Sequence, residues 1–188
     1  MQRNPGQSTP LVEKVWVTRS GKAVTLRPIA PTDQALTNAF VQNLSFATKY
    51  FRFGRGDMAF SPEQLAVICN PDPRLCRRLI ALITGPAGDI QIGSAAFAFR
   101  PDKKHCDLTI TIADGWQGTR VAHYLMSMLI ETARECGVFK MYAQVLATNR
   151  RMQAFAQRHG FQLLASDANG GVREFCLSLH DESAPATS

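Results

Sequence analysis

The chemically most informative residues lie between positions 107 and 122, where one stretch of chain holds a carboxylate and a glycine-bearing turn. Gly118 lies in a turn that leads directly from a predicted strand into a predicted amphipathic helix. The start of a helix presents unpaired backbone N–H groups and the positive end of the helix dipole, which together favour a phosphate. Asp107 lies upstream on the strand and could accept a proton. The segment therefore combines an anion-binding turn with a candidate base.

The strand that carries this carboxylate is predicted at residues 105–113, where polar and apolar side chains alternate. Successive side chains of a strand point to opposite faces. One face therefore holds the polar residues His105, Asp107, Thr109 and Thr111, and the other holds Cys106, Leu108, Ile110 and Ile112. The polar face is available to a cleft, which makes Asp107 a candidate general base and His105 its substitute. A solvated strand carboxylate is the alternative interpretation of Asp107, as a surface residue is of His105.

The elements around this strand are predicted from periodicity and from end signals. Apolar residues recur at helical spacing over residues 119–136, and Gly137 ends that helix. A strand at residues 138–145 follows, and then a helix from Asn149 to His159. Upstream, residues 32–43 are predicted to form a helix. Ser45 caps a further short helix and Ser61 another, because serine is a favoured N-cap.

This order of elements predicts a mixed α/β fold, with a mostly antiparallel sheet of about seven strands and helices on both faces. The connection from strand 105–113 through the long helix to strand 138–145 is expected to be parallel and right-handed. No linker rich in glycine, proline or serine divides the chain. Residues 14–180 are therefore predicted to form a single domain, between flexible tails at 1–13 and 181–188.

Composition limits the class of protein. The chain has 188 residues, of which 45% are hydrophobic and 19% charged, which is typical of a globular protein with a full core. The formal net charge of +6 suits an anionic ligand such as a nucleotide cofactor. Nucleic acid is an unlikely partner, because the basic residues are scattered along the chain and form no run.

Several classes of segment are missing from the sequence. No apolar run reaches the roughly 18 residues of a membrane helix, and residues 1–10 lack the apolar centre of a secretory signal. The five cysteines form no CxxC motif, so reduced thiols in a cytoplasmic protein are expected and no membrane association is predicted. His123 and His159 have no carboxylate at ligand spacing, so no metal site is assigned.

The chain resembles the GNAT superfamily of acetyl-CoA-dependent N-acetyltransferases. The resemblance extends from the opening TLRP at residues 25–28 to HGF at residues 159–161. The LS pair at 44–45, YFRF at 50–53 and DGWQG at 114–118 are most similar to the acetyltransferase domain of bacterial protein-lysine acetyltransferases. The resemblance implies a sheet that splays between strands 105–113 and 138–145, with acetyl-CoA bound in the opening.

The resemblance also implies the cofactor site. The family's pyrophosphate loop reads Q/R-x-x-G-x-G/A, and residues 117–122 read QGTRVA, so Arg120 replaces the usual middle glycine. A side chain there is tolerable if the backbone stays helical, because backbone N–H groups bind the phosphate. The implied cofactor-binding residues are Ile110, Thr111, Ile112, Gln117, Gly118, Thr119, Arg120, Val121, Ala122, Asn149 and Met152.

The implied reaction is acetyl transfer to a primary amine, with a protein lysine among the candidate acceptors. A lysine of pKa about 10.4 costs roughly 4–5 kcal/mol to deprotonate at neutral pH, and Asp107, in register with the family's glutamate base, would assist that step. Ala156 stands where many members carry a tyrosine acid. These departures keep open a second interpretation, a catalytically weak acyl-CoA-binding regulatory module. The sequence does not identify the acceptor, and a homodimer is compatible with it.

Overall fold

The computed structural model describes residues 13–18, 21–166 and 170–180, so the predicted tails at 1–13 and 181–188 lie almost wholly outside the described residues. These residues form one sheet of eight strands in the order β1-β2-β3-β4-β5-β6-β8-β7. The strands are β1 (Lys14–Val17), β2 (Ala23–Pro28), β3 (Cys76–Gly85), β4 (Gly88–Phe99), β5 (His105–Ile112), β6 (Lys140–Leu146), β7 (Gln162–Ser166) and β8 (Val172–Ser178). The sheet is antiparallel except between β5 and β6, as predicted, and it has one strand more than expected.

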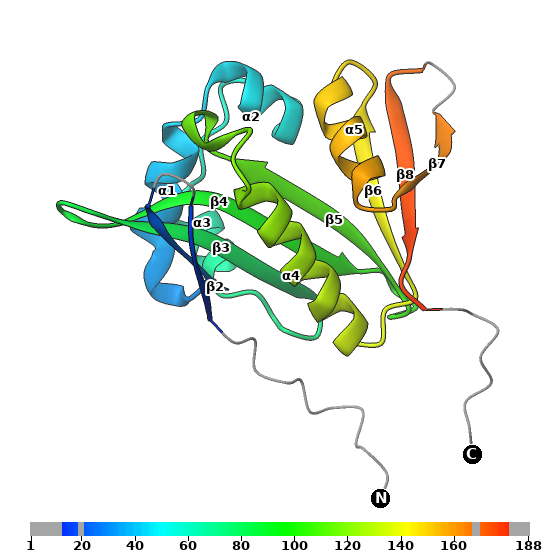
Figure 1. The fold of residues 1–188 in the computed structure, drawn as a ribbon, viewed down its shortest axis with the longest axis horizontal. Helices are drawn as coiled ribbons and strands as arrows, with labels where there is room; N and C mark the ends of the chain where they lie inside the picture. Colours follow the sequence, from blue (N-terminus) through cyan, green and yellow to red (C-terminus); the bar gives the residue numbers. More distant parts are fainter. Residues whose placement is uncertain (1–12, 19–20, 167–169, 181–188) are drawn as a thin grey trace, which may run out of the picture.

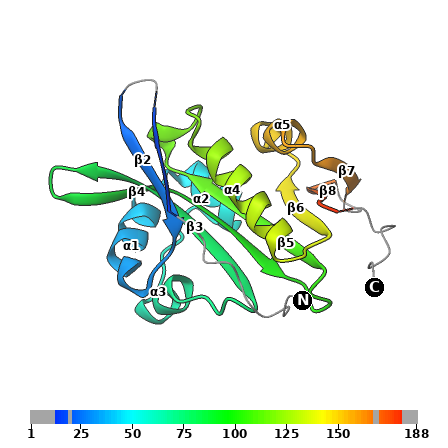
Figure 2. The ribbon, with the colours of Figure 1, turned by 60° about the horizontal axis from the view of Figure 1, so that its bottom comes forward.

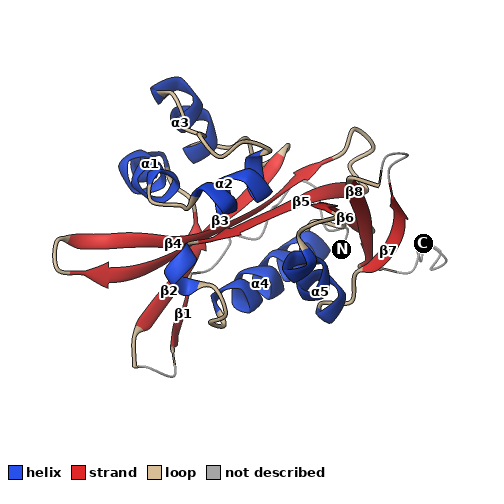
Figure 3. Ribbon diagram, turned by 90° about the horizontal axis from the view of Figure 1, so that it is seen from above, coloured by secondary structure: helices blue, strands red, loops and turns tan. Residues whose placement is uncertain are grey.

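Helices cover both faces of the sheet, which confirms the predicted layers (Figure 3). One face carries α1 (Gln34–Gln42), α2 (Phe46–Phe53) and α3 (Pro62–Cys69). The other face carries α4 (Val121–Glu135) and α5 (Arg150–Arg158). The predicted helix at 119–136 is longer than α4 because its first two residues belong to the preceding turn and its last residue, Cys136, is the C-cap.

The predicted serine caps are present at the start of two of these helices. The side chain of Ser45 accepts a hydrogen bond from the Thr48 N–H, and the side chain of Ser61 accepts one from the Gln64 N–H. Each bond satisfies an N–H group that the helix itself leaves without a partner. The caps therefore fix where α2 and α3 begin, and α2 becomes one wall of the cleft described below.

The main core lies between α4 and the central strands. Phe97 of β4 and Leu125, Met126 and Leu129 of α4 are completely or almost completely buried. Figure 2 shows α4 lying across the middle of the sheet. Burying such side chains stabilises the fold by roughly 1.5–3 kcal/mol each, so this contact holds the start of α4 firmly against β4 and β5.

β5 and β6 pair over only three residues, from His105 opposite Lys140 to Asp107 opposite Tyr142. Beyond this pairing the two strands separate toward their carboxyl ends (Figure 1). β5 stays paired with β4 as far as Ile112, and β6 stays paired with β8 as far as Leu146. Because each strand is held on its outer side, the opening between them is a fixed feature of the sheet, as the family resemblance implied.

Gly93 lies on β4 where α4 crosses the strand. A Cβ atom at this position would come within 2.9 Å of Leu125 Cδ1 and 3.0 Å of Ile112 Cδ1. Gly93→Val adds this atom and two methyl groups to a closely packed contact, so we expect it to lower the free energy of unfolding by about 1–3 kcal/mol. Urea denaturation measures the change. Gly115→Ala is the matched control, because no atom lies within 4 Å of the added Cβ there. Equal stability of both variants would contradict the close approach of α4.

Candidate active site

The opening between β5 and β6 contains a cavity of about 810 Å3. Its walls come from α2, β5, the turn before α4, the first turns of α4, β6 and α5. The predicted cofactor-binding residues that line it are Ile110, Thr111, Ile112, Gln117, Gly118, Thr119, Arg120, Ala122, Asn149 and Met152. Val121, also predicted, does not line the cavity because its side chain is completely buried in the core. The predicted cofactor residues therefore make up most of one wall of the cavity, and none of them belongs to α2, which forms another wall.

The turn before α4 has the backbone geometry of an anion-binding turn. Gly118 has a φ of +81°, a conformation that favours glycine. Arg120 has a φ of −81° and a ψ of 1°, so its side chain causes no backbone strain. α4 begins at the next residue, and the N–H groups of its first turn have no acceptor within the helix. The condition under which Arg120 can replace a glycine is therefore met.

Asp114 fastens α2 to this turn. Its carboxylate accepts hydrogen bonds from the Ser45 N–H (2.8 Å), the Ser45 hydroxyl (2.7 Å) and the Thr48 hydroxyl (2.7 Å). Burial opposes ionisation of Asp114, but the hydrogen bonds from Ser45 and Thr48 outweigh it and hold its pKa below the usual value. Two of the three motifs that carried the closer family resemblance, the LS pair at 44–45 and DGWQG at 114–118, are thus in direct contact.

Gln117 joins three walls of the cavity. Its side-chain amide donates to Thr48 Oγ1 of α2 (3.1 Å) and to the carbonyl oxygen of Ile112 on β5 (3.3 Å). Its side-chain carbonyl accepts from Arg151 Nη1 of α5 (2.8 Å). Another guanidinium nitrogen of Arg151 lies 3.4 Å from the position of a Cβ at Gly118. Arg151 was not predicted, although a basic residue at the start of a helix beside a phosphate turn is a usable signal.

This end of the cavity is positively charged. Arg120, Arg151 and Arg158 all line it, and so do His123 and His159. His159 Nδ1 lies 2.9 Å from the Phe155 carbonyl and so donates to it, which leaves Nε2 to accept from His123 Nδ1 at 3.0 Å. Burial lowers the pKa of His123, and the neighbouring His159 and Arg120 add to the effect. The charge at this end therefore comes from the arginines.

Asn149 caps α5 beside the same cavity. Its side-chain oxygen accepts a hydrogen bond from the Met152 N–H at 3.1 Å. Both residues also line the cavity, so the capping role and a role at the ligand coexist. Ala156, at the position of the family's tyrosine, is completely buried in the core, and Phe155 faces the cavity instead.

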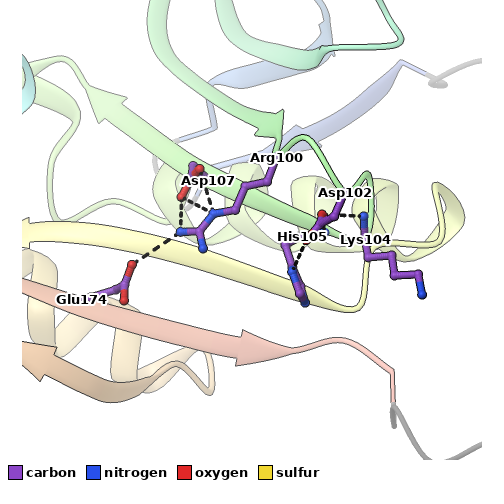
Figure 4. A network of polar contacts seen from close by, with 6 residues as sticks. All are labelled: Arg100, Asp102, Lys104, His105, Asp107 and Glu174. Atoms are coloured by element: carbon purple, nitrogen blue, oxygen red, sulfur yellow. Dashed lines mark hydrogen bonds and ion pairs between the residues drawn. The ribbon is translucent and has the colours of Figure 1, made fainter.

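Asp107 lies just beyond the narrow end of the cavity and is ion-paired (Figure 4). The guanidinium of Arg100 approaches its carboxylate at 2.7 Å and stacks 3.8 Å from the centre of the Tyr142 ring. Arg100 also contacts Glu174 of β8 at 3.4 Å. The hydrogen bond with Asp107 raises the pKa of Arg100. Arg100 was absent from the sequence prediction, because it lies in a turn with no motif of its own.

His105, the substitute base, also lies outside the lining of the cavity. Its Nδ1 is 2.7 Å from a carboxylate oxygen of Asp102, which lies in the turn before β5 (Figure 4). His105 and Asp107 are both on the polar side of β5, as the alternation predicted, but the nearest polar β5 side chains in the cavity are Thr109 and Thr111. Within the described residues, no group of three histidine, cysteine or acidic side chains is arranged to hold a metal.

Comparison with known proteins agrees with this geometry. The profile of the acetyltransferase (GNAT) domain matches residues 23–162. An acetyltransferase of Pseudomonas aeruginosa is 30% identical over 141 residues, which cover 75% of this chain and 76% of the relative. The chain therefore belongs to the GNAT acetyltransferase family, as the sequence predicted.

Solved structures show the same fold. The GNAT domain of PAT from S. lividans has a TM-score of 0.78 at 22% identity, covering 88% of this chain and 96% of that domain. The yncA protein of Salmonella typhimurium, solved with its cofactor acetyl-CoA, has a TM-score of 0.71 at 20% identity, covering 88% and 99%. Among the described residues, no helix is long and apolar enough to span a membrane.

Asp114 accepts its hydrogen bonds as a carboxylate, so we expect its substitution to change the free energy of unfolding in a pH-dependent way. Asp114→Asn weakens three hydrogen bonds, so we expect it to lower the free energy of unfolding by about 1 kcal/mol at pH 7. The folded-state pKa of Asp114 is lowered from 3.8, so the carboxylate contributes fully above that value and its contribution is lost as pH falls through the folded pKa. The difference between wild type and variant should therefore shrink below about pH 4.

Urea denaturation between pH 3 and pH 7 measures this difference. Asp89→Asn is the control, since Asp89 is exposed near the start of β4 and, within the described residues, its side chain accepts one long hydrogen bond of 3.4 Å from Thr84. A stability difference for Asp114→Asn that stayed constant with pH would refute the carboxylate's role in holding α2.

Proposed function

We propose that the protein transfers the acetyl group of acetyl-CoA to a primary amine, by direct attack of the amine and without an acetylated enzyme. The single observation that carries the proposal is the cavity between β5 and β6, which ends at the N-terminus of α4 with three arginines around it. Membership of an acetyltransferase family supports the same reaction. The thioester supplies an activated acetyl group.

The cavity suits a ligand with a phosphate end and an amide-bearing arm. The turn around Gly118, the first turn of α4 and the arginines Arg120 and Arg151 suit the pyrophosphate. Along β5, the backbone from Ile110 to Ile112 has no partner on β6, because the strands pair only as far as Asp107. Amide groups of a bound arm would hydrogen-bond to the backbone groups of this segment that face the opening, apart from the Ile112 carbonyl, which already accepts from Gln117. The fit therefore covers both ends of the predicted cofactor.

The transfer requires a neutral amine. The nitrogen lone pair attacks the carbonyl carbon, a C–N bond forms, the C–S bond breaks, and one proton is released for each ammonium acetylated. We propose Asp107 as the group that accepts the amine proton, through water, because it lies next to the narrow end of the cavity. The side chain of Ala156 has no ionisable group that could donate a proton, so the departing thiolate takes its proton from solvent.

The binding-module alternative differs from the enzyme in one observable. In both cases the binding of acetyl-CoA stabilises the fold, but only an enzyme releases free thiol when an amine is present. The ion pair between Arg100 and Asp107 is the observation that favours the alternative, because it already occupies the proposed base. Thiol release with a panel of primary amines, including lysine peptides, decides between the two.

The first test of this proposal is cofactor binding at the turn before α4. Acetyl-CoA at about 100 times its dissociation constant should raise the free energy of unfolding by about 2.7 kcal/mol. If the Arg120 side chain binds a phosphate, Arg120→Ala should weaken acetyl-CoA more than it weakens pantetheine. If only the backbone binds, Arg120→Gly should bind as well as wild type. Thermal melting with each ligand measures these differences. A melting curve unmoved by millimolar acetyl-CoA would rule out the site.

The second test concerns the base. Asp107→Asn removes proton acceptance with little change of shape and should lower the acetylation rate by roughly 10²–10⁴-fold, with partial recovery at higher pH. Glu174→Gln is the matched control, because Glu174 shares Arg100 with Asp107 but is not the proposed base. Asp107→Glu restores the length of the family's base and should retain activity. Thiol release measured from pH 6 to pH 9 reports each rate. Full activity of Asp107→Asn at neutral pH would exclude Asp107 and leave His105 as the next candidate.

A further inference from the structure

The α2 wall of the cleft contains an arginine for which the described residues offer no anionic partner. Arg52 of α2 lines the cavity. It lies one helical turn beyond Thr48, about 6 Å further along α2 from the end that contacts Asp114 and Gln117. Within the described residues, no carboxylate forms an ion pair with Arg52, and its guanidinium rests 4.9 Å from the ring centre of Phe53. Arg52 is therefore separate from the arginines at the phosphate end.

A second arginine, which forms no ion pair within the described part of the chain, lies behind Arg52 on the same face of the sheet. Arg78 of β3 is opposite Ala96 of β4, which is opposite Thr109 of β5, so these three residues form a row that leads to the cavity. The Nε atom of Arg78 is buried without a hydrogen-bond partner, and Nη1 reaches only Ser94, at 3.5 Å.

Burial of both guanidinium groups is unfavourable, because each carries a charge. Burial lowers the pKa of Arg52 to about 10, and the charge of Arg78 adds to the effect. Burial also lowers the pKa of Arg78. Arg52 remains charged at neutral pH, so two cations stay close together in a partly buried site. An anionic group would relieve this repulsion and desolvation, because a buried charge is stable when it is paired and hydrogen-bonded.

The acidic residues of the cavity do not provide this group. Among the described residues that line the cavity, the one carboxylate is Asp114, and its oxygens already accept from Ser45 and Thr48. Asp107 is paired with Arg100. In contrast, the exposed Arg55, just after α2, is paired with Asp57 at 2.9 Å. The chain thus pairs an arginine at the surface and leaves the one at the cavity for a ligand.

We propose that the acceptor is a small primary amine that carries its own anionic group, a carboxylate in the first instance, and that Arg52 binds this group while Arg78 reinforces the charge behind it. The inference rests on the proposed amine acetylation and adds the class of acceptor. A lysine side chain without a nearby anion brings only positive charge into this site, which Coulomb repulsion disfavours. The cations have a second consequence: they favour the neutral form of the bound amine, which is the form that reacts.

The test compares acceptors in pairs that differ only in charge. Free thiol release is measured with a series of α-amino acids, with their carboxamides, with aminomethylphosphonate and with a lysine peptide whose termini are blocked. We expect kcat/KM to be roughly 10–100-fold higher for a carboxylate than for its carboxamide, the usual worth of a charge-assisted hydrogen bond. The comparison is conservative, since the amine of a carboxamide is the less basic and more of it is neutral. Aminomethylphosphonate shows whether the site prefers a phosphonate to a carboxylate.

Two variants assign the preference to a residue. Arg52→Gln should reduce the carboxylate-to-carboxamide ratio toward one, mainly through a higher KM for the carboxylate. Arg55→Gln, with the same change three residues away, should keep the wild-type ratio. Melting curves establish that each variant is folded. The ratio in wild-type protein tests the acceptor class even if Arg52→Gln does not fold.

The outcomes distinguish a failure of this inference from a failure of the proposed amine acetylation. If none of the amines causes thiol release, the proposed amine acetylation is refuted, and the acceptor class with it. Release that is equal for carboxylates and carboxamides, or greatest for the blocked lysine peptide, would refute only the acceptor class. A wild-type preference that survives in folded Arg52→Gln would place the anion elsewhere and overturn the role of Arg52.

Discussion

The active site depends on one constraint, the short pairing of β5 with β6. Three residue pairs hold these strands together at one end, while β4 and β8 hold their outer edges over the full length. The opening therefore lies inside the sheet and not at its edge. Backbone groups on both inner edges lack a strand partner, and such groups favour a ligand that can hydrogen-bond to them. The narrow end of this opening brings Asp107 and Tyr142 together, and the wide end meets the start of α4.

α2 converts this opening into a cleft with two chemical ends. Asp114 and Gln117 hold the start of α2 against the turn before α4 through Ser45 and Thr48. The same helix carries Arg52 into the cavity one turn later. Because one short helix contacts both ends, a movement of the turn before α4 would also move the α2 wall that carries Arg52. The link between the two ends is therefore a few hydrogen bonds to one exposed carboxylate.

The sequence predicted the elements with strong local signals and missed contacts made by tertiary structure. The alternation along β5, the caps at Ser45 and Ser61, and the parallel β5–β6 connection followed from periodicity and cap chemistry. Most of the predicted cofactor residues line the cavity because they belong to one strand and the turn that follows it. The ion pair of Arg100 with Asp107 was not predictable, since it depends on how the β4–β5 turn folds back on the strand. Arg52 was noted in the sequence, but only the structure places it in the cavity without a carboxylate.

The distribution of charge explains how an amine could become neutral at a site whose candidate base is already paired. The carboxylate of Asp107 already accepts hydrogen bonds from the guanidinium of Arg100. Cations beside the acceptor act in the same direction as a base, because they disfavour the ammonium form. Arg52 and Arg78 lie on the face of the sheet that also presents Thr109 to the cavity. An anionic group on the acceptor would bind to these cations and hold the amine beside them, so recognition and deprotonation would both depend on the same pair of arginines.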